Sequence, residues 1–85
     1  MSELPIILRA DVIAQVEAHL DGRLSQSNLA GWAFARFYAE ELGQEAYEQG
    51  AEEALADALD VLMFDDDPSF ALDEVELRDL IAKLR

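Results

Sequence analysis

The stretch SQSNLAGWAFARFYAEELG, residues 25–43, decides the fold. Between positions 29 and 39 its only charged residue is Arg36. Its aromatic residues would lie all around a helix and not along one stripe: Trp32, Phe34, Phe37 and Tyr38. A helix that is apolar on all sides is typically buried on more than one side. The stretch therefore predicts a central helix over residues 25–42.

Local signals mark both ends of this helix. Ser25 can accept hydrogen bonds from the free backbone N–H groups of the first turn. Leu24, just before it, can pack on Leu29 as a hydrophobic staple. Gly43 follows Leu42 and is the residue type that most readily adopts the left-handed conformation after a helix. We therefore expect the helix to begin at the serine and to end before the glycine.

Apolar residues recur at helical spacing on both sides of this stretch. Before it, an extended strap over residues 1–10, which contains Pro5, leads into a helix over residues 11–20. After it, helices are expected over residues 44–64 and 73–84. The inner faces of these three helices are expected to consist of Val12, Ile13, Val16 and Leu20, then Tyr47, Ala51, Leu55, Ala58, Leu59 and Leu62, and finally Leu77, Leu80, Ile81 and Leu84.

The connections between these helices are short, which favours antiparallel neighbours. Gly50 is placed inside the third helix, near the edge of its apolar face. Asp73 and Glu76 form a capping box at the start of the fourth helix. Apart from the strap at Pro5–Leu8, no segment alternates as a strand does. The sequence thus predicts a single-domain, all-α, four-helix bundle.

The charge balance narrows the range of partners. The 85 residues contain 19 Asp and Glu against 6 Lys and Arg, a formal net charge of −13. Nucleic acids and anionic membranes repel such a surface, so neither is expected to be a partner. The chain has no cysteine, which excludes disulfides and thiolate metal sites. A basic protein is the partner that this charge favours.

The sequence also bears on the cellular location of the protein. The first residues, MSELPIIL, include Glu3 and no basic cluster, so no secretory signal is expected. The longest apolar run, LAGWAFA at residues 29–35, is far shorter than the ~20 residues that cross a bilayer. A cytoplasmic protein is the expectation.

Acidic residues are concentrated in the second half of the chain. Residues 1–42 contain six acids and three bases, whereas residues 43–85 contain thirteen acids and three bases. Six acids fall in the predicted third helix with no basic residue between them, and they form the candidate partner-binding site: Glu45, Glu48, Glu52, Glu53, Asp57 and Asp60. The alternative is a solvated face that only keeps a small protein soluble.

The stretch DDDPSFALDEVE, residues 65–76, resembles the twelve-residue calcium loop of an EF-hand. Aligned with that loop, the candidate metal ligands are Asp65, Asp67, Ser69, Asp73 and Glu76. Phe70 stands where the loop needs a glycine with positive φ, and Pro68 stiffens the turn. The alternative is structural, with the first aspartates ending one helix and Asp73 and Glu76 capping the next. No other cofactor is indicated.

Nothing in the sequence marks a catalytic centre. His19 is the only histidine, and it has no cysteine partner. A catalytic triad would need a preformed cleft around it, and there is no glycine-rich phosphate loop. We therefore expect no enzyme activity.

Two resemblances accompany these observations. The phrase LDGRLSQSNLAGWA, residues 20–33, is similar to a pattern in short bacterial proteins, in which a glycine ends one helix and a serine caps the next. In size, acidity and helical content the chain also resembles bacterial toxin-immunity proteins, notably those that neutralise nuclease colicins with acidic helices. It lacks their paired tyrosines, so no residue role is carried over. The resemblance implies an immunity or inhibitor protein.

The sequence thus favours a non-enzymatic, acidic protein-binding module. Two alternatives remain open. One is a calcium-binding module built on residues 65–76. The other is a subunit of a homo-oligomer, because the apolar helix at 25–42 exceeds what four helices can cover.

Overall fold

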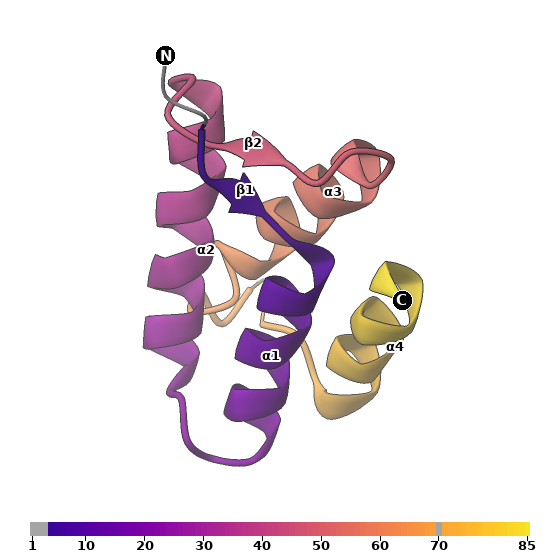
Figure 1. The fold of residues 1–85 in the computed structure, drawn as a ribbon. Helices are drawn as coiled ribbons and strands as arrows, with labels where there is room; N and C mark the ends of the chain where they lie inside the picture. The colour runs from indigo at the N-terminus through magenta and orange to yellow at the C-terminus, as the bar shows by residue number, and fades with distance from the viewer. Residues whose placement is uncertain (1–3, 70) are drawn as a thin grey trace.

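The computed structural model describes residues 4–69 and 71–85 and is predominantly helical (Figure 1). The predicted all-α fold with four helices is confirmed, with one small addition, a pair of two-residue strands. In chain order the elements are β1 (Ile6–Ile7), α1 (Arg9–Leu20), α2 (Gln26–Glu41), β2 (Ala46–Tyr47), α3 (Glu52–Leu62) and α4 (Glu74–Leu84). No helix among the described residues is long and apolar enough to cross a bilayer.

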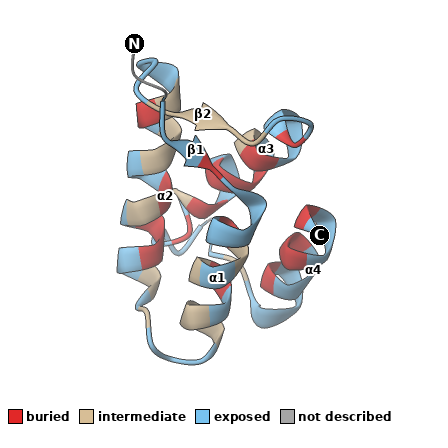
Figure 2. Ribbon diagram, in the orientation of Figure 1, coloured by how far each residue is buried: buried red, intermediate tan, exposed pale blue. Residues whose placement is uncertain are grey.

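The helices pack around one core. Helix α2 packs against α1 and α3, and α4 packs against α1 and α3 from the other side (Figure 1). Helices α1, α3 and α4 each turn one face inward, as their helical spacing predicts. Figure 2 shows the buried parts of the four helices turned toward the centre. The fully buried large side chains of the core are Val12, Val16, Leu29, Leu55, Leu59, Leu62, Leu77 and Leu84.

The two strands form a parallel pair at one end of the molecule. Ile6 lies opposite Ala46 and Ile7 opposite Tyr47. Ile7 is 2% exposed and belongs to the core, whereas Ile6 points outward and is 49% exposed. The expected strap over residues 1–10 is therefore a paired strand followed directly by α1. Its residues 1–3 lie outside the described part of the chain.

The third helix is shorter than its apolar spacing indicates. The prediction of a helix over 44–64 is wrong at its start, because α3 begins only at Glu52. Gly50 has φ of +89°, a left-handed conformation that is incompatible with a helix interior. The residues before it pair with β1 instead, so their backbone N–H groups donate to Pro5 (from Ala46) and to Ile7 (from Glu48) at 3.0 and 2.9 Å.

Two of the predicted signals at the ends of α2 are confirmed. The Ser25 hydroxyl accepts the Asn28 backbone N–H at 3.0 Å, and Gly43 has φ of +76°. Helix α2 packs against α1, α3 and β2, so it is buried on more than one side, as expected, but its burial is not complete. Its buried residues are Leu29 and three alanines. Its outer side and the residue that follows it leave large apolar side chains exposed to solvent: Phe34 (52% exposed), Tyr38 (45%) and Leu42 (69%).

Candidate protein-binding site

Four of the six predicted partner-binding acids form one surface on α3. Glu52, Glu53, Asp57 and Asp60 are all exposed. At 100° per residue they lie within an arc of about 140°. The buried residues Leu55, Ala58, Leu59 and Leu62 occupy the opposite side of the helix. We call these four carboxylates the acidic face.

Local physics explains why the acidic face can exist on a stable helix. Glu52 and Glu53 lie in the first turn of α3, where negative charge interacts favourably with the helix dipole. Glu52 Oε1 also accepts the backbone N–H of Gly50 at 2.9 Å. Glu53 and Asp57 are like charges four residues apart, an arrangement that costs ~0.2–0.5 kcal/mol. The buried apolar stripe of α3 outweighs that cost.

The other two predicted site residues do not belong to this surface. Glu45 and Glu48 precede α3, and each is held in an ion pair within the fold. The Arg36 Nη1 atom lies 2.7 Å from Glu45 Oε2, and Arg9 Nη2 lies 2.8 Å from Glu48 Oε2. The Glu45 side chain is only 13% exposed. Both glutamates therefore fasten the segment between α2 and α3, which the helical reading of residues 44–64 missed.

Charge neutralisation in this molecule is complete for the bases and partial for the acids. All six Lys and Arg side chains form ion pairs, namely Arg9–Glu48, Arg23–Asp21, Arg36–Glu45, Arg78–Glu74, Lys83–Asp79 and Arg85–Glu17. Within the described residues, none of these pairs reaches the acidic face. The excess charge of the chain is therefore concentrated partly on α3, opposite its core side.

Two groups near β2, the Glu48 carboxyl and the Tyr47 hydroxyl, have shifted pKa values. Hydrogen bonds from the Arg9 backbone and side chain lower the pKa of Glu48, and the guanidinium charge acts in the same direction. Burial raises the pKa of Tyr47, and the nearby charges of Glu40 and Glu41 raise it further. Both groups lie in or beside β2, so they belong to the frame of the fold and not to the acidic face.

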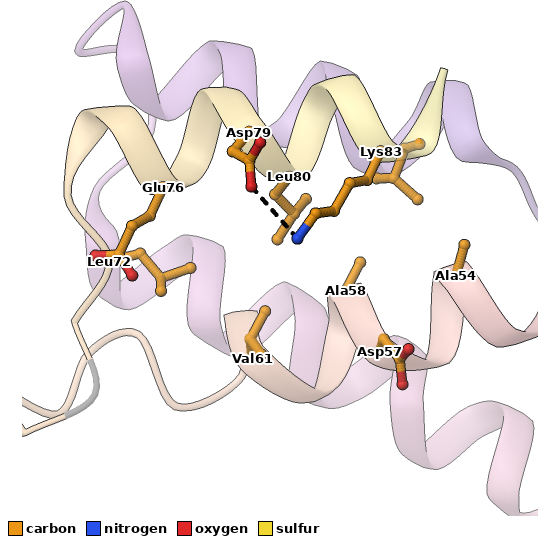
Figure 3. Close-up of a pocket in the computed structure, with 10 residues that line it drawn as sticks. Ala54, Asp57, Ala58, Val61, Leu72, Glu76, Asp79, Leu80 and Lys83 are labelled. Carbon is orange, nitrogen blue, oxygen red and sulfur yellow. Dashed lines mark ion pairs between the residues drawn. The ribbon is translucent and has the colours of Figure 1, made fainter.

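Beside the acidic face, a groove of about 380 Å³ runs between α3 and α4 (Figure 3). Its floor is apolar and comes from Ala54, Ala58 and Val61 of α3, Leu72 of the preceding loop, and Leu80 and Leu84 of α4. Asp57 belongs to both surfaces, since it lies on the acidic face and also lines the groove. The groove and the acidic face are therefore continuous.

The comparisons with known proteins do not place the chain in a family. Neither family models, curated proteins nor solved structures give a match to the chain.

The five predicted calcium ligands do not form one cluster. Asp67 Oδ1 accepts the Ser69 backbone N–H at 2.9 Å. Asp73 Oδ1 accepts the Glu76 N–H at 2.8 Å, and Glu76 Oε1 accepts the Asp73 N–H at 3.2 Å, so the predicted capping box is confirmed. No group of three or more acidic or histidine side chains suited to a metal occurs within residues 4–69 and 71–85. The predicted role of Phe70 lies outside those residues.

Asp65 has a structural position that the sequence did not indicate. It is 0% exposed, and its Oδ1 accepts the Leu72 backbone N–H at 2.7 Å. Its carbonyl oxygen accepts a hydrogen bond from Gln26 Nε2, at the start of α2. Its Oδ2 is buried and has no hydrogen-bond partner among the described residues. Asp65 thus ties the loop before α4 to α2.

His19 also has a local structural contact. Its Nδ1 lies 2.9 Å from the carbonyl oxygen of Leu24. This contact spans the turn between α1 and α2, and the ring is partly buried there. The histidine is therefore part of that turn.

Proposed function

We propose that this chain is a non-enzymatic module that binds a basic protein through the acidic face of α3. The observation that carries the proposal is the distribution of ion pairs. Every Lys and Arg side chain is paired with a carboxylate outside that face. Since the face has no cationic partner among the described residues, a partner's Lys and Arg side chains can take that place.

Electrostatics sets what such a surface contributes. Complementary charge raises association rates by ~10- to 10³-fold at low salt and favours partners of the right charge. The gain in affinity is smaller, because charged groups lose hydration when they are brought together. The acidic face is therefore suited to rapid capture of a basic protein, with the tightness of the complex supplied by other contacts.

An immunity or inhibitor protein is the specific form of this proposal. A toxin that acts on nucleic acid needs a basic surface to hold its substrate, and an acidic helix that covers this surface would block it. The small helical scaffold and the net charge of −13 support this form. A cytoplasmic location, where such a toxin would have to be held inactive, is part of the proposal and agrees with the absence of cysteine.

A binding experiment with charge-reversed variants tests the proposal. Immobilised protein is used to recover a basic partner from cell extract, and association rates are then measured at low and physiological salt. Replacing Glu53 and Asp60 by Lys should slow association at low salt by about tenfold or more. Replacing the exposed acids Glu41 and Asp66 by Lys changes the net charge equally and serves as the control. Equal effects of the two double variants, or the absence of a basic partner, would contradict the proposal.

A second candidate function is a subunit of a homo-oligomer. It is favoured by the outer side of α2, where the rings of Phe34 and Tyr38 make a tilted contact, with centroids 4.6 Å apart, and remain half exposed. Sedimentation of the protein and of the variant Tyr38→Lys tests it. A dimer that the substitution dissociates would support this candidate, and a monomer at all concentrations would exclude it.

A further inference from the structure

The groove between α3 and α4 exposes apolar surface that the fold does not use. Val61 is 42% exposed, and Leu72 packs only partly against the core. Ala58 lies across the groove from the larger Leu80, and Ala54 lies further along α3, across from Lys83 (Figure 3). Small side chains on α3 therefore leave space between the two helices. Removing such surface from water is favourable by about 25 cal/mol per Å². A partner that covers the groove would therefore gain binding free energy by burying apolar surface that is exposed in the isolated chain.

The rim of the groove is predominantly negative. Asp57 contributes from α3, and Glu76 and Asp79 contribute from α4. Among the described residues, Lys83 is the only base on the rim, and its Nζ lies 3.3 Å from Asp79 Oδ2 (Figure 3). This pair neutralises itself, so two carboxylates remain, one on each side of the apolar floor. Charge complementarity thus selects an occupant that is apolar on one face and basic on both flanks.

We propose that this groove binds an amphipathic helix of the basic partner. Apolar residues of that helix at positions i, i+3 or i+4, and i+7 would lie on the floor, and flanking Lys or Arg would pair with Asp57 and Glu76. The described residues that line the groove belong to two helices and a loop, and none of them to a strand. The binding mode is therefore a helix in a groove and not strand addition. The inference rests on the proposed function and identifies the part of the partner that is bound.

The division of work between the two surfaces follows from their chemistry. The acidic face is exposed to solvent, so it acts mainly on association. The groove has an apolar floor, and burial of apolar side chains chiefly slows dissociation. Because Asp57 belongs to both surfaces, a basic helix drawn toward α3 arrives beside the groove.

Two synthetic peptides provide the probe. One is a fluorescein-labelled helix with Leu at i, i+3, i+4 and i+7 and Lys on both flanks. The other has the same composition in scrambled order, so it keeps the charge and loses the apolar stripe. We expect the patterned peptide to bind at least tenfold more tightly in anisotropy titrations. If the scrambled and patterned peptides bind with equal affinity, the proposal that the groove binds an amphipathic helix is overturned. Binding by charge, and hence the proposed function, would still stand.

A substitution that fills the groove provides the second test. Ala54 is exposed at the groove on α3, so Ala54→Trp should obstruct the floor without overpacking the core. We expect it to weaken the patterned peptide at least tenfold. Ala35→Trp, at an exposed position on α2, is the matched control and should leave binding unchanged. Equal effects of both variants would overturn the proposal.

Chemical-shift mapping of the unmodified protein keeps the test independent of folding of the variants. Addition of the patterned peptide should shift the backbone amide resonances of Ala54, Ala58 and Leu80. Shifts confined to the outer side of α2, or no shifts at all, would overturn the proposal. Reversal of Glu53 and Asp60 tests the acidic face separately, since neither residue lines the groove.

Discussion

Arg9, which begins α1 after β1, and Glu48, which follows β2, are joined by hydrogen bonds and an ion pair across 39 positions of sequence. Both carboxylate oxygens take part. Oε1 accepts the Arg9 backbone N–H at 3.0 Å, and Oε2 accepts Nε at 3.0 Å and lies 2.8 Å from Nη2. Glu48 therefore accepts hydrogen bonds from both the backbone N–H and the guanidinium of Arg9, in the first turn of α1.

This relationship predicts a pH-dependent contribution to stability. The pKa of Glu48 is lower in the folded chain than its ordinary value of about 4.3. The contribution is therefore complete above that pH and is lost as the pH falls through the lower, folded pKa. Glu48→Gln should lower Tm at neutral pH, and the difference from the unmodified protein should shrink in acid. Glu53→Gln is the control, and a difference that stays constant with pH would contradict the assignment.

Asp65 predicts a contrast between two substitutions. Asp65→Ala leaves the Leu72 N–H without its acceptor, which should cost ~1–3 kcal/mol. Asp65→Asn retains an acceptor oxygen and removes a buried charge, so it should be at least as stable as the unmodified protein. Urea unfolding measures both. Equal losses in the two variants would show that the charge itself is needed.

Trp32 and Phe34 lie two positions apart on α2 and should differ in their effect on stability. Trp32 packs against the core, whereas Phe34 is 52% exposed. Trp32→Ala should therefore cost ~3 kcal/mol, at the lower end of the range for truncating a buried tryptophan. Phe34→Ala should cost less than ~1 kcal/mol. Urea unfolding of the two variants measures both losses of stability. A larger loss for Phe34→Ala than for Trp32→Ala would contradict the orientation of α2, in which Trp32 faces the core and Phe34 faces solvent.

Calcium is expected to leave the protein unchanged. The oxygens of the loop at 65–76 already serve a cap, a turn and a buried backbone N–H. A site with a Kd of ~10 µM would add about 2.7 kcal/mol at ~1 mM calcium, where the ligand is in hundredfold excess over Kd. That is ~10 °C or more in Tm for a domain of this size. We expect no such shift, and saturable binding abolished by Glu76→Gln would restore the metal hypothesis.

The sequence predicted those features that depend on neighbours along the chain. Ser25 and the pair Asp73 and Glu76 cap their helices because a cap needs only a side chain three residues away. The buried stripe of α4 follows from helical spacing alone, and Leu77, Leu80, Ile81 and Leu84 are all in the core. The fold class follows from the sum of such local patterns.

Features that depend on distant partners could not be predicted in this way. A two-residue strand has no alternation to detect, and β1 exists because residues 46–47 lie beside it. Gly50 fits both a close helix contact and a left-handed turn, and only the pairing of β2 decides between them. The predicted six-residue acidic site is incomplete for the same reason. Glu45 and Glu48 form ion pairs with arginines of α2 and α1, which are distant in the sequence.

The parallel strand pair also bears on the order in which the chain folds. Its two halves are 40 residues apart, so a long loop must close before they gain anything from contact. The turn between α1 and α2 needs far less closure, and these helices can form first. The strands should accordingly be the last part to dock and the first to open, exposing Ile7. The amide hydrogens of Ala46 and Glu48 would then exchange through a local opening, well below the free energy of global unfolding.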